Sequence, residues 1–302
     1  MTAPAVEPTS HKRRGVAVVI GSGSVKCAAS LGLVNALDRA NIPIDMLVGC
    51  SAGCLYATLL ASGRTTAQAA DMTRELWTSS ITERHNRMAW LKAAFPRLFR
   101  FDARFGLRDD ALIMQRLAAA FGESRIETMK IPLHLTATDF ATGNQMVFSR
   151  GRAIDAIRAS IAVPFLFSPW PIDGRLYIDG YMSDPLPVGV AMREGADVIV
   201  AMGFDSPNQE RVSNAARFAF QVSSILSNNL LKSQFAFHGL AHHAEIIPII
   251  PQFGERIRLF DTEKIPYIIE EGERAAVEQI PYLKRLLAAQ AQDSAPAAAG
   301  AG

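Results

Sequence analysis

The sequence predicts an α/β protein built around a mainly parallel sheet, and three observations support this prediction. An unbroken apolar run at residues 16–20 has the composition of a central strand that is covered on both faces. A glycine-rich turn at 21–24 follows it and opens a helix. A second short strand at 46–48 leads through a sharp turn at 49–53 into another helix. Strand, glycine turn and helix repeated in this order are typical of a doubly wound α/β fold.

The remaining elements continue this alternation. In the first helix Leu31, Val34 and Leu37 share one face, and the second helix is expected to end at Gly63. Residues 65–121 have a mostly helical pattern and are expected to cover a sheet edge or the site. Further strands are predicted at 133–138, 146–148, 175–178, 198–202 and 245–250, and helices at 153–159, 188–194 and 215–232.

The bulk composition favours one large globular domain. The chain has 302 residues, of which 49% are hydrophobic and 20% charged, and its formal net charge is +2. Because this charge is small and no recognised nucleic-acid-binding motif is present, we expect no nucleic-acid partner. We expect a disordered basic tail at 1–14, a single domain at 15–287, and a disordered Ala- and Gly-rich tail at 288–302.

No segment has the features of a secretory signal or a membrane span. The basic residues 11–14 precede an apolar run that is too short for the apolar region of a signal. The other apolar runs are broken by Gly, Pro or charge. Cys27, Cys50 and Cys54 have no nearby histidine to complete a zinc site, so we expect free buried thiols, no metal and no cofactor. These features predict a cytoplasmic protein.

The turn Gly49-Cys50-Ser51-Ala52-Gly53 has the pattern of a serine nucleophile placed between a strand and a helix. Such a turn holds the serine in a strained conformation and needs small neighbours, because strand and helix nearly collide there. The helix dipole favours negative charge on the serine oxygen, and the N–H of Ala52 would serve as an oxyanion donor. The pattern predicts a serine acyl hydrolase with Ser51 as nucleophile; a turn of small residues with no catalytic role is the alternative.

The upstream turn Gly21-Ser22-Gly23-Ser24 has two interpretations. Successive N–H groups at the start of a helix can hold an anion, as in a dinucleotide-phosphate loop. That fingerprint requires a third glycine, where this chain has Lys26. It also requires an acidic residue at the end of the second strand, whereas Asp45 precedes that strand. We favour an oxyanion hole formed by the N–H groups near Gly23 and Ser24, because turns at adjacent strand ends converge on one site.

Asp179 is the candidate general base. Asp173-Gly174 and Asp179-Gly180 both have the sequence that is commonest in hairpin turns, and the first pair fits a hairpin well. The second pair stands where a predicted strand ends, with no partner strand after it. A carboxylate at a strand exit could meet Ser51 and take its proton directly.

A Ser-Asp-His triad is the alternative, with His242 or His243 as the base. An ordinary α/β-hydrolase, however, has its nucleophile after several strands, whereas Ser51 follows the second predicted strand. This position counts against a triad.

Together these motifs resemble those of the bacterial patatin-like phospholipases, over roughly residues 14–202. The resemblance rests on 21–37, on 49–53, on Ala137-Thr138-Asp139 with Thr142-Gly143, on Arg158-Ala159-Ser160 with Pro164, and on Asp179-Gly180. It implies a three-layer α/β/α fold with a mainly parallel central sheet, and a Ser–Asp dyad that hydrolyses lipid acyl esters. By this resemblance the nucleophile is Ser51, the base is Asp179, and the loop around Gly23 is the oxyanion hole. The motif positions around them are Gly21, Lys26, Gly49, Gly53 and Gly180.

Several positions depart from the family pattern. The family loop usually carries another glycine and an Arg–Gly pair where this chain has Ser24 and Lys26-Cys27, and a small residue where this chain has Tyr181. Lys26 keeps the positive charge but replaces a forked donor with a point charge. We expect Cys27 and Tyr181 to narrow the pocket or slow the enzyme.

Residues 84–108, here called the basic–aromatic segment, interleave cationic and aromatic side chains, with Asp102 as the only acid. The cations are Arg84, Arg87, Lys92, Arg97, Arg100, Arg104 and Arg108, and the aromatic residues are Trp90, Phe95, Phe99, Phe101 and Phe105. This mixture suits an anionic lipid surface and predicts peripheral contact with a membrane. An ordinary surface helix with its apolar face in the core is the alternative.

We therefore predict an esterase or phospholipase that acts on phospholipids, lysophospholipids or other lipid esters through an acyl-Ser51 intermediate. Two alternatives stay open. One is a regulatory or lipid-binding protein with little turnover, and the other is an acyltransferase that uses the same acyl-enzyme. The sequence indicates no particular oligomeric state.

Overall fold

The computed structural model describes residues 14–100, 102–204, 215–241 and 244–293. Its parallel strands are, in spatial order, β3 (Leu133–Asp139), β2 (Met46–Cys50), β1 (Arg14–Ile20), β7 (Ala196–Met202) and β8 (Glu245–Ile249). The register pairs Ile20 with Gly49, so β1 and β2 end side by side. The turns that follow these two strands therefore lie at the same edge of the sheet.

Antiparallel strands complete the sheet beyond β3. They are β4 (Gln145–Phe148), β5 (Trp170–Ile172) and β6 (Arg175–Ile178). Asp173 and Gly174 join β5 to β6 with positive φ angles of 48° and 78°, which are those of a two-residue hairpin turn. The predicted hairpin at this Asp-Gly pair is confirmed, and β6 then delivers the chain to Asp179.

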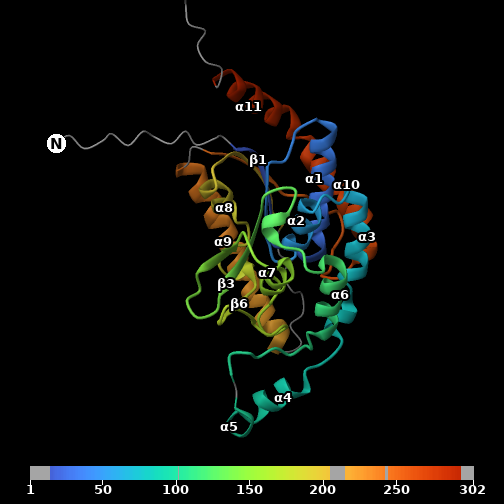
Figure 1. The fold of residues 1–302 in the computed structure, drawn as a ribbon, viewed down its shortest axis with the longest axis vertical. Coiled ribbons are helices and arrows are strands. Elements are labelled where there is room, and N and C mark those ends of the chain that lie inside the picture. The colour runs from blue at the N-terminus through green and yellow to red at the C-terminus, as the bar shows by residue number, and fades with distance from the viewer. Residues whose placement is uncertain (1–13, 101, 205–214, 242–243, 294–302) are drawn as a thin grey trace, which may run out of the picture.

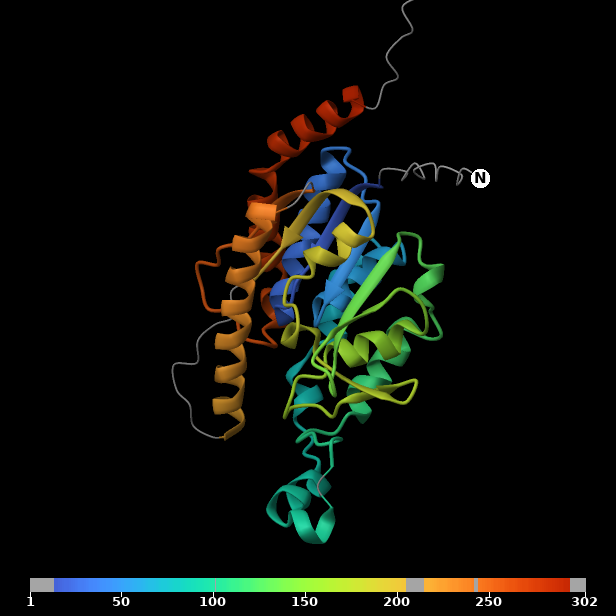
Figure 2. The ribbon, with the colours of Figure 1, turned by 90° about the vertical axis from the view of Figure 1, so that its left-hand side faces the viewer.

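Helices cover both faces of the sheet, and Figures 1 and 2 show the resulting three layers. One face carries α1 (Ala29–Arg39), α2 (Gly53–Ala61), α3 (Thr66–Leu76), α6 (Ala111–Phe121), α7 (Ala153–Ser160) and α10 (Ile265–Val277). The other face carries α8 (Val188–Arg193) and α9 (Ala215–Ala241). The predicted three-layer α/β/α fold is confirmed.

The apolar run of β1 shows why the sheet needs helices on both faces. Val16, Val18 and Ile20 pack into the larger core cluster, while Ala17 and Val19 pack into the cluster on the opposite face. Each of these side chains is at most 1% exposed. Because successive side chains of a strand point to opposite faces, an unbroken apolar run is stable only where both faces are covered.

One region projects from this body at the lower end in Figure 1. After η2 (Ser79–Thr82), the chain forms α4 (Arg87–Ala94) and α5 (Pro96–Phe99) and then returns to α6. The chain that returns from this projection is hydrogen-bonded to the body. The N–H groups of Leu107 and Arg108 donate to the carbonyls of Phe165 and Leu166, each at 3.0 Å. The projection contains most of the basic–aromatic segment.

Short 3-10 helices and a final helix complete the described chain. They are η1 (Ser24–Ala28), η3 (Ile126–Thr128), η4 (Gly180–Met182), η5 (Thr262–Lys264) and α11 (Ile280–Asp293). Within the residues that the structure describes, no helix combines the length and the apolarity needed to cross a membrane.

Some expected boundaries differ from the structure. Arg14, assigned to the first tail, is the first residue of β1, because it pairs with Ala196 of β7. The second tail was expected from residue 288, but α11 continues to Asp293. Alanine favours the helical conformation, which is why an Ala-rich stretch can extend a helix. The rest of both tails, residues 1–13 and 294–302, lies outside the described residues.

Candidate functional site

Ser51 occupies the sharp turn between β2 and α2. Its φ angle is +54°, a left-handed conformation that is costly for a residue with a side chain. Gly49 and Gly53 permit this turn. A Cβ on Gly53 would lie 2.4 Å from the carbonyl oxygen of Ile20, and one on Gly49 would lie 2.8 Å from Cα of Cys54. The expectation that strand and helix nearly collide here is confirmed.

The buried hydroxyl of Ser160, the last residue of α7, holds this turn in place. It accepts a hydrogen bond from the backbone N–H of Ser51 at 2.7 Å and one from the thiol of Cys54 at 3.0 Å. It donates its own proton to the carbonyl of Thr136 at 2.6 Å. One donor and two acceptors use the full capacity of a hydroxyl. The motif around Ser160 was recognised in the sequence, but this contact with the nucleophile turn was not.

The side chain of Asp179 lies directly against Ser51. Ser51 Oγ donates to Asp179 Oδ2 at 2.8 Å, although the two residues are 128 positions apart in the chain. The other carboxylate oxygen accepts from the N–H of Tyr181 at 3.1 Å. The backbone N–H of Asp179 donates to the carbonyl of Ala162 at 3.0 Å. The structure thus brings together the two residues that were predicted to act as nucleophile and base.

Burial changes the acidity of this carboxyl group. Asp179 is 0% exposed, and loss of solvation raises its pKa to about 7. The hydrogen bonds from Tyr181 N–H and Ser51 Oγ lower the pKa, but by less than burial raises it. A carboxylate with a pKa near neutrality is a much stronger base than an exposed one, and it can also return the proton within the same reaction.

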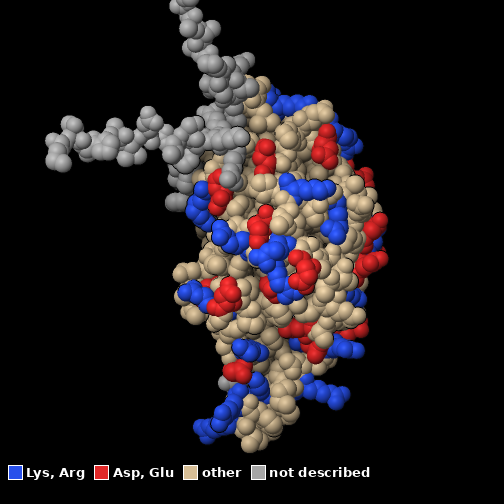
Figure 3. All heavy atoms as spheres, viewed as in Figure 1, with Lys and Arg blue, Asp and Glu red and all other residues tan. Residues whose placement is uncertain are grey.

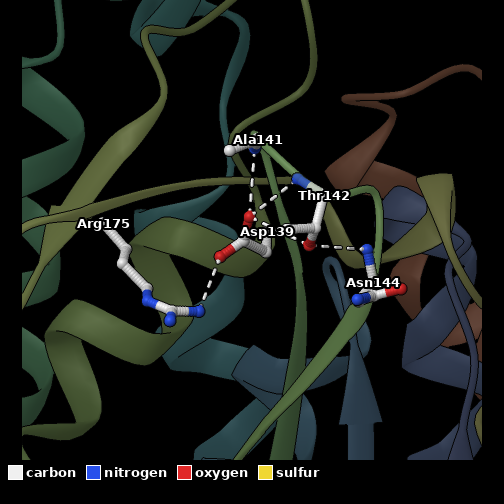
Figure 4. A network of polar contacts seen from close by, with 5 residues as sticks. All are labelled: Asp139, Ala141, Thr142, Asn144 and Arg175. Carbon is white, nitrogen blue, oxygen red and sulfur yellow. Dashed lines mark hydrogen bonds and ion pairs between the residues drawn. The ribbon is translucent and has the colours of Figure 1, made fainter.

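The motif residues Thr138 and Asp139, at the end of β3, position the chain around Asp179. Thr138 Oγ1 donates to the carbonyl of Asp179 at 2.9 Å. The carboxylate of Asp139 accepts from the N–H groups of Ala141 and Thr142, both at 3.0 Å, and lies 3.3 Å from Nη1 of Arg175, the first residue of β6 (Figure 4). These hydrogen bonds, led by that from Thr142 N–H, lower the pKa of Asp139. The network fixes the turn after β3 and links it to the strand that leads to the candidate base.

The glycine-rich loop lies beside the Ser51 turn, since a Cβ on Gly53 would also meet the carbonyl oxygen of Gly21 at 2.7 Å. The N–H of Gly21 donates to Met202 of β7 at 3.0 Å. Among the described residues, the N–H groups of Gly23, Ser24 and Ala52 donate to no acceptor. Unused donors on two adjacent turns are what an oxyanion hole requires.

The side chain of Ser24 holds this loop in place through two hydrogen bonds. The φ angle of Ser24 is +53°, which glycine adopts more easily than serine, and the family pattern has glycine at this position. Its hydroxyl donates to the carbonyl of Leu259 at 2.5 Å and accepts from the indole N–H of Trp77 at 2.9 Å. The ammonium of Lys26 lies 5.7 Å from the ring centre of Phe253. Hydrogen bonds to distant segments therefore hold the strained conformation at Ser24.

The other departures from the family pattern lie in different environments. Cys27 is 0% exposed in the core, with its thiol 3.3 Å from the carbonyl of Gly21, so it does not line an open pocket. Tyr181 stands next to the site, and its phenol lies beside Ser223 of α9. Burial, helped by the Asp179 charge, raises the pKa of Tyr181. Gly180 packs tightly, because a Cβ there would lie 2.7 Å from the carbonyl of Thr136.

Arg158 anchors the region around the site; it belongs to a motif recognised in the sequence, but its ion pair was not predicted. Its side chain is 0% exposed and forms an ion pair with Asp110, at 2.7 Å, beside the start of α6. Its guanidinium donates to the carbonyl of Ser168 at 3.1 Å and lies 5.2 Å and 5.1 Å from the ring centres of Phe167 and Trp170. The pair fastens the chain that returns from the projection to α7, the helix that ends beside the nucleophile turn.

The three cysteines are free and buried, as expected. Burial raises the pKa of each thiol, to about 12 for Cys54. In the part of the chain that the structure describes, no group of His, Cys, Asp and Glu side chains could hold a metal ion. The triad alternative relied on His242 and His243, and both lie outside the described residues.

Comparison with family models matches residues 18–192 to the family described as patatin-like phospholipase. An uncharacterized NTE family protein of Mycobacterium tuberculosis is 32% identical over 208 residues, which are 68% of this chain and 53% of that protein. The chain therefore belongs to the patatin-like phospholipase family.

Other proteins match part of the chain at lower identity. Patatin-like phospholipase domain-containing protein 6 of Homo sapiens is 25% identical over 200 residues, which are 66% of this chain and 14% of that protein. The crystal structure of VipD from Legionella pneumophila aligns with a TM-score of 0.44 and 13% identity, over 90% of this chain and 67% of that one. This chain thus matches about half of the mycobacterial relative and a small part of the human one.

Proposed function

We propose that this protein is a serine hydrolase that cleaves acyl esters of phospholipids, lysophospholipids or other lipids through an acyl-Ser51 intermediate. The observation that carries the proposal is the 2.8 Å hydrogen bond from Ser51 Oγ to the buried carboxylate of Asp179. A nucleophile activated by an adjacent base is the general requirement of covalent acyl transfer. Membership of a phospholipase family supports lipid esters as the substrate class.

In the first half of the reaction, Ser51 Oγ forms a bond with the ester carbonyl carbon while its proton passes to Asp179. The tetrahedral intermediate then collapses, the bond to the leaving alcohol breaks, and Asp179 returns the proton to that alcohol. The raised pKa of Asp179, about 7, supports both transfers near neutral pH.

In the second half, water attacks the acyl group on Ser51 and gives a proton to Asp179. The bond from the acyl carbon to Ser51 Oγ breaks, and the serine recovers the proton. The products are a fatty acid and the free enzyme, so Asp179 acts alternately as base and acid. No further reactant is needed.

The negative charge on the carbonyl oxygen is proposed to be held by the N–H groups of Gly23, Ser24 and Ala52, which have no other acceptor among the described residues. Each such donor contributes about 2.7–4 kcal/mol to stabilisation of the transition state. The start of α2, directly after Ser51, adds the positive end of a helix dipole. Lys26 contributes positive charge near the same loop.

The basic–aromatic segment is proposed to contact an anionic lipid surface. Its large apolar side chains are not in the core: Trp90 is 53% exposed, Phe95 57% and Leu98 75%. Phe165, at the base of the projection, is 50% exposed. Figure 3 shows Lys and Arg side chains around this lower end of the molecule. Exposed aromatic and cationic side chains together favour the headgroup region of an anionic bilayer.

A shallow, open depression on this projection fits the same interpretation. It is lined by His85, Arg87, Trp90, Leu91 and Ala94, so it combines apolar side chains with the cation of Arg87 and has no acidic side chain. An ordinary surface helix would bury its apolar face, but in α4 the buried residue is the small Ala89. The free, buried thiols support a reducing compartment such as the cytoplasm.

Two substitutions test the dyad. Ser51→Ala and Asp179→Ala are each expected to lower the hydrolysis of a soluble chromogenic acyl ester by at least about a thousandfold, because nucleophile and base act as one unit. Ser124→Ala and Asp71→Ala serve as matched controls, because neither is near the dyad; the Asp71 side chain is 73% exposed. Circular dichroism would check that all four variants are folded.

Substantial activity left in Asp179→Ala would disprove the dyad, and loss of activity in His242→Ala would favour the triad instead. Fluorophosphonate labelling of Ser51 separates an enzyme from a regulatory or lipid-binding protein. A folded protein whose Ser51 is not labelled would support the latter. Product analysis with an added alcohol acceptor would reveal an acyltransferase as a transferred acyl ester in place of free fatty acid.

A further inference from the structure

Between residues 218 and 227, helix α9 exposes large apolar side chains and buries small polar ones. Its side chains that face the sheet include Ser224 and Ser227, which are only 4% and 6% exposed. Its exposed side chains include large apolar ones, namely Phe218 at 62%, Val222 at 41%, Ile225 at 44% and Leu226 at 59%. Their spacing of four, three and one residues places them on one side of the helix. We call these four residues the outer stripe.

The inner side of α9 lies against the candidate active site. Ser223 lies beside the phenol of Tyr181, two residues after Asp179. Leu231 is 7% exposed and packs into the core cluster on this face of the sheet. An α-helix with its side chains is about 10–12 Å across, so the outer stripe is about one helix diameter from Tyr181. Figure 2 shows that α9 begins at the end of the molecule from which α4 and α5 project.

The charge of α9 favours an anionic partner. Residues 215–241 contain Arg217 and Lys232 but neither Asp nor Glu. The basic–aromatic segment, at the same end of the molecule, has only Asp102 as an acid. A second copy of this chain would present the same acid-free helix and offers no complementary charge there. A layer of anionic lipid headgroups over an apolar interior complements both the charge and the stripe.

We propose that the outer stripe of α9 inserts into the headgroup region of an anionic lipid bilayer and forms a second docking element beside the basic–aromatic segment. This inference rests on the proposed function in that the bilayer would also contain the substrate. An amphipathic helix in this position buries its apolar face about 5–10 Å into the lipid. The dyad is then held about one helix diameter from the surface.

The experiment uses the full chain and sucrose-loaded vesicles of phosphatidylglycerol and phosphatidylcholine, with pure phosphatidylcholine for comparison. Binding is measured by co-sedimentation. The double substitution Phe218→Ser with Leu226→Ser is expected to lower the affinity for anionic vesicles at least about tenfold, because it removes two large exposed apolar groups that the lipid would bury. The matched control is Val277→Ser on α10, which removes a side chain that is 53% exposed in the opposite helical layer. Its binding is expected to stay within twofold of the unsubstituted chain.

Each outcome decides between clear alternatives. Unchanged vesicle binding by the folded double variant, with melting temperature as the check on folding, would overturn the proposal. So would absence of binding by the unsubstituted chain. A dimer seen by light scattering that dissociates in the double variant would assign the stripe to a second copy. Hydrolysis of a soluble ester by the unsubstituted chain tests the proposed function separately, so failure of one proposal is distinguishable from failure of the other.

Discussion

The nucleophile turn and the basic–aromatic segment differ in how they are held. Ser51 is 9% exposed, and its N–H and its hydroxyl are each bonded to a side chain from a distant part of the sequence. The basic–aromatic segment instead places Trp90, Phe95 and Leu98 in solvent and is fastened mainly at its base. Catalysis requires that the reacting atoms are held in a fixed geometry, whereas contact with a fluid lipid surface requires exposed apolar side chains. We therefore expect substitutions in the two regions to affect different measurements.

The largest effect is expected from Asp179→Asn. The amide cannot accept the proton of Ser51, so ester hydrolysis should fall by at least about a thousandfold. The same change should stabilise the fold at pH 8, because it removes a charge that is buried in the native state. Comparison of turnover with the free energy of unfolding by urea checks both outcomes.

The stability gain of Asp179→Asn should depend on pH in a defined direction. The pKa of Asp179 is raised by burial from 3.8 to about 7, so the native state favours the neutral acid. Below pH 4 the carboxyl group is neutral in both the native and the unfolded state, so it does not destabilise the fold. As the pH rises toward 7, the unfolded state ionises more readily than the native state, and the free energy of unfolding falls. The gain from asparagine should grow over that range and approach about 4 kcal/mol at pH 8. A gain that is larger at pH 4 than at pH 8 would contradict the assigned burial effect.

The next effect is that of pH on the unsubstituted enzyme. Asp179 must be ionised to accept a proton, so kcat/KM should fall about tenfold for each pH unit below its pKa of about 7. At pH 5 the rate on a soluble ester should be about a hundredfold below its plateau. A profile that is flat from pH 5 to pH 8 would mean that another group is the base.

A smaller effect is expected from Ser160→Ala, which removes the acceptor of the Ser51 N–H. Ser160 touches no reacting atom and is a positioning residue. Its loss should misplace the nucleophile and lower kcat about tenfold to a hundredfold, with KM nearly unchanged. Ser160→Thr keeps a hydroxyl and should restore part of the rate. A parallel rise in KM with kcat constant would indicate a role in substrate binding instead.

The smallest effect on the chemistry is expected in the basic–aromatic segment. Trp90→Ser with Phe95→Ser should leave turnover of a soluble ester within about twofold, because surface substitutions away from a site have small effects. Hydrolysis of lipid in anionic vesicles should fall several-fold, and more so at high salt, where the attraction of the remaining Arg and Lys side chains to the surface is screened. An equal loss on both substrates would place this segment in the active site and end the distinction between the two regions.

Much of the fold could be read from local patterns. The strand at 175–178 has the predicted bounds, and the other predicted strands are present with ends shifted by at most two residues. These predictions succeeded because strand burial and glycine turns are encoded in adjacent residues. Helix α9 was expected to end near residue 232, but it continues to Ala241. Helix ends depend on packing and capping as well as on propensity, which makes them harder to predict.

Within the candidate site, the sequence by itself singled out Ser51, Asp179 and the glycine-rich loop, because each belongs to a short motif at a strand end. The tertiary structure decided what connects them. Ser160 reaches the Ser51 N–H across 109 positions, and Ser24 reaches Leu259 across 235 positions. Such contacts form only when the sheet and its helices are assembled. For the same reason, the burial that raises the pKa of Asp179 and the outward direction of the apolar face of α9 have no signal in any single stretch of sequence.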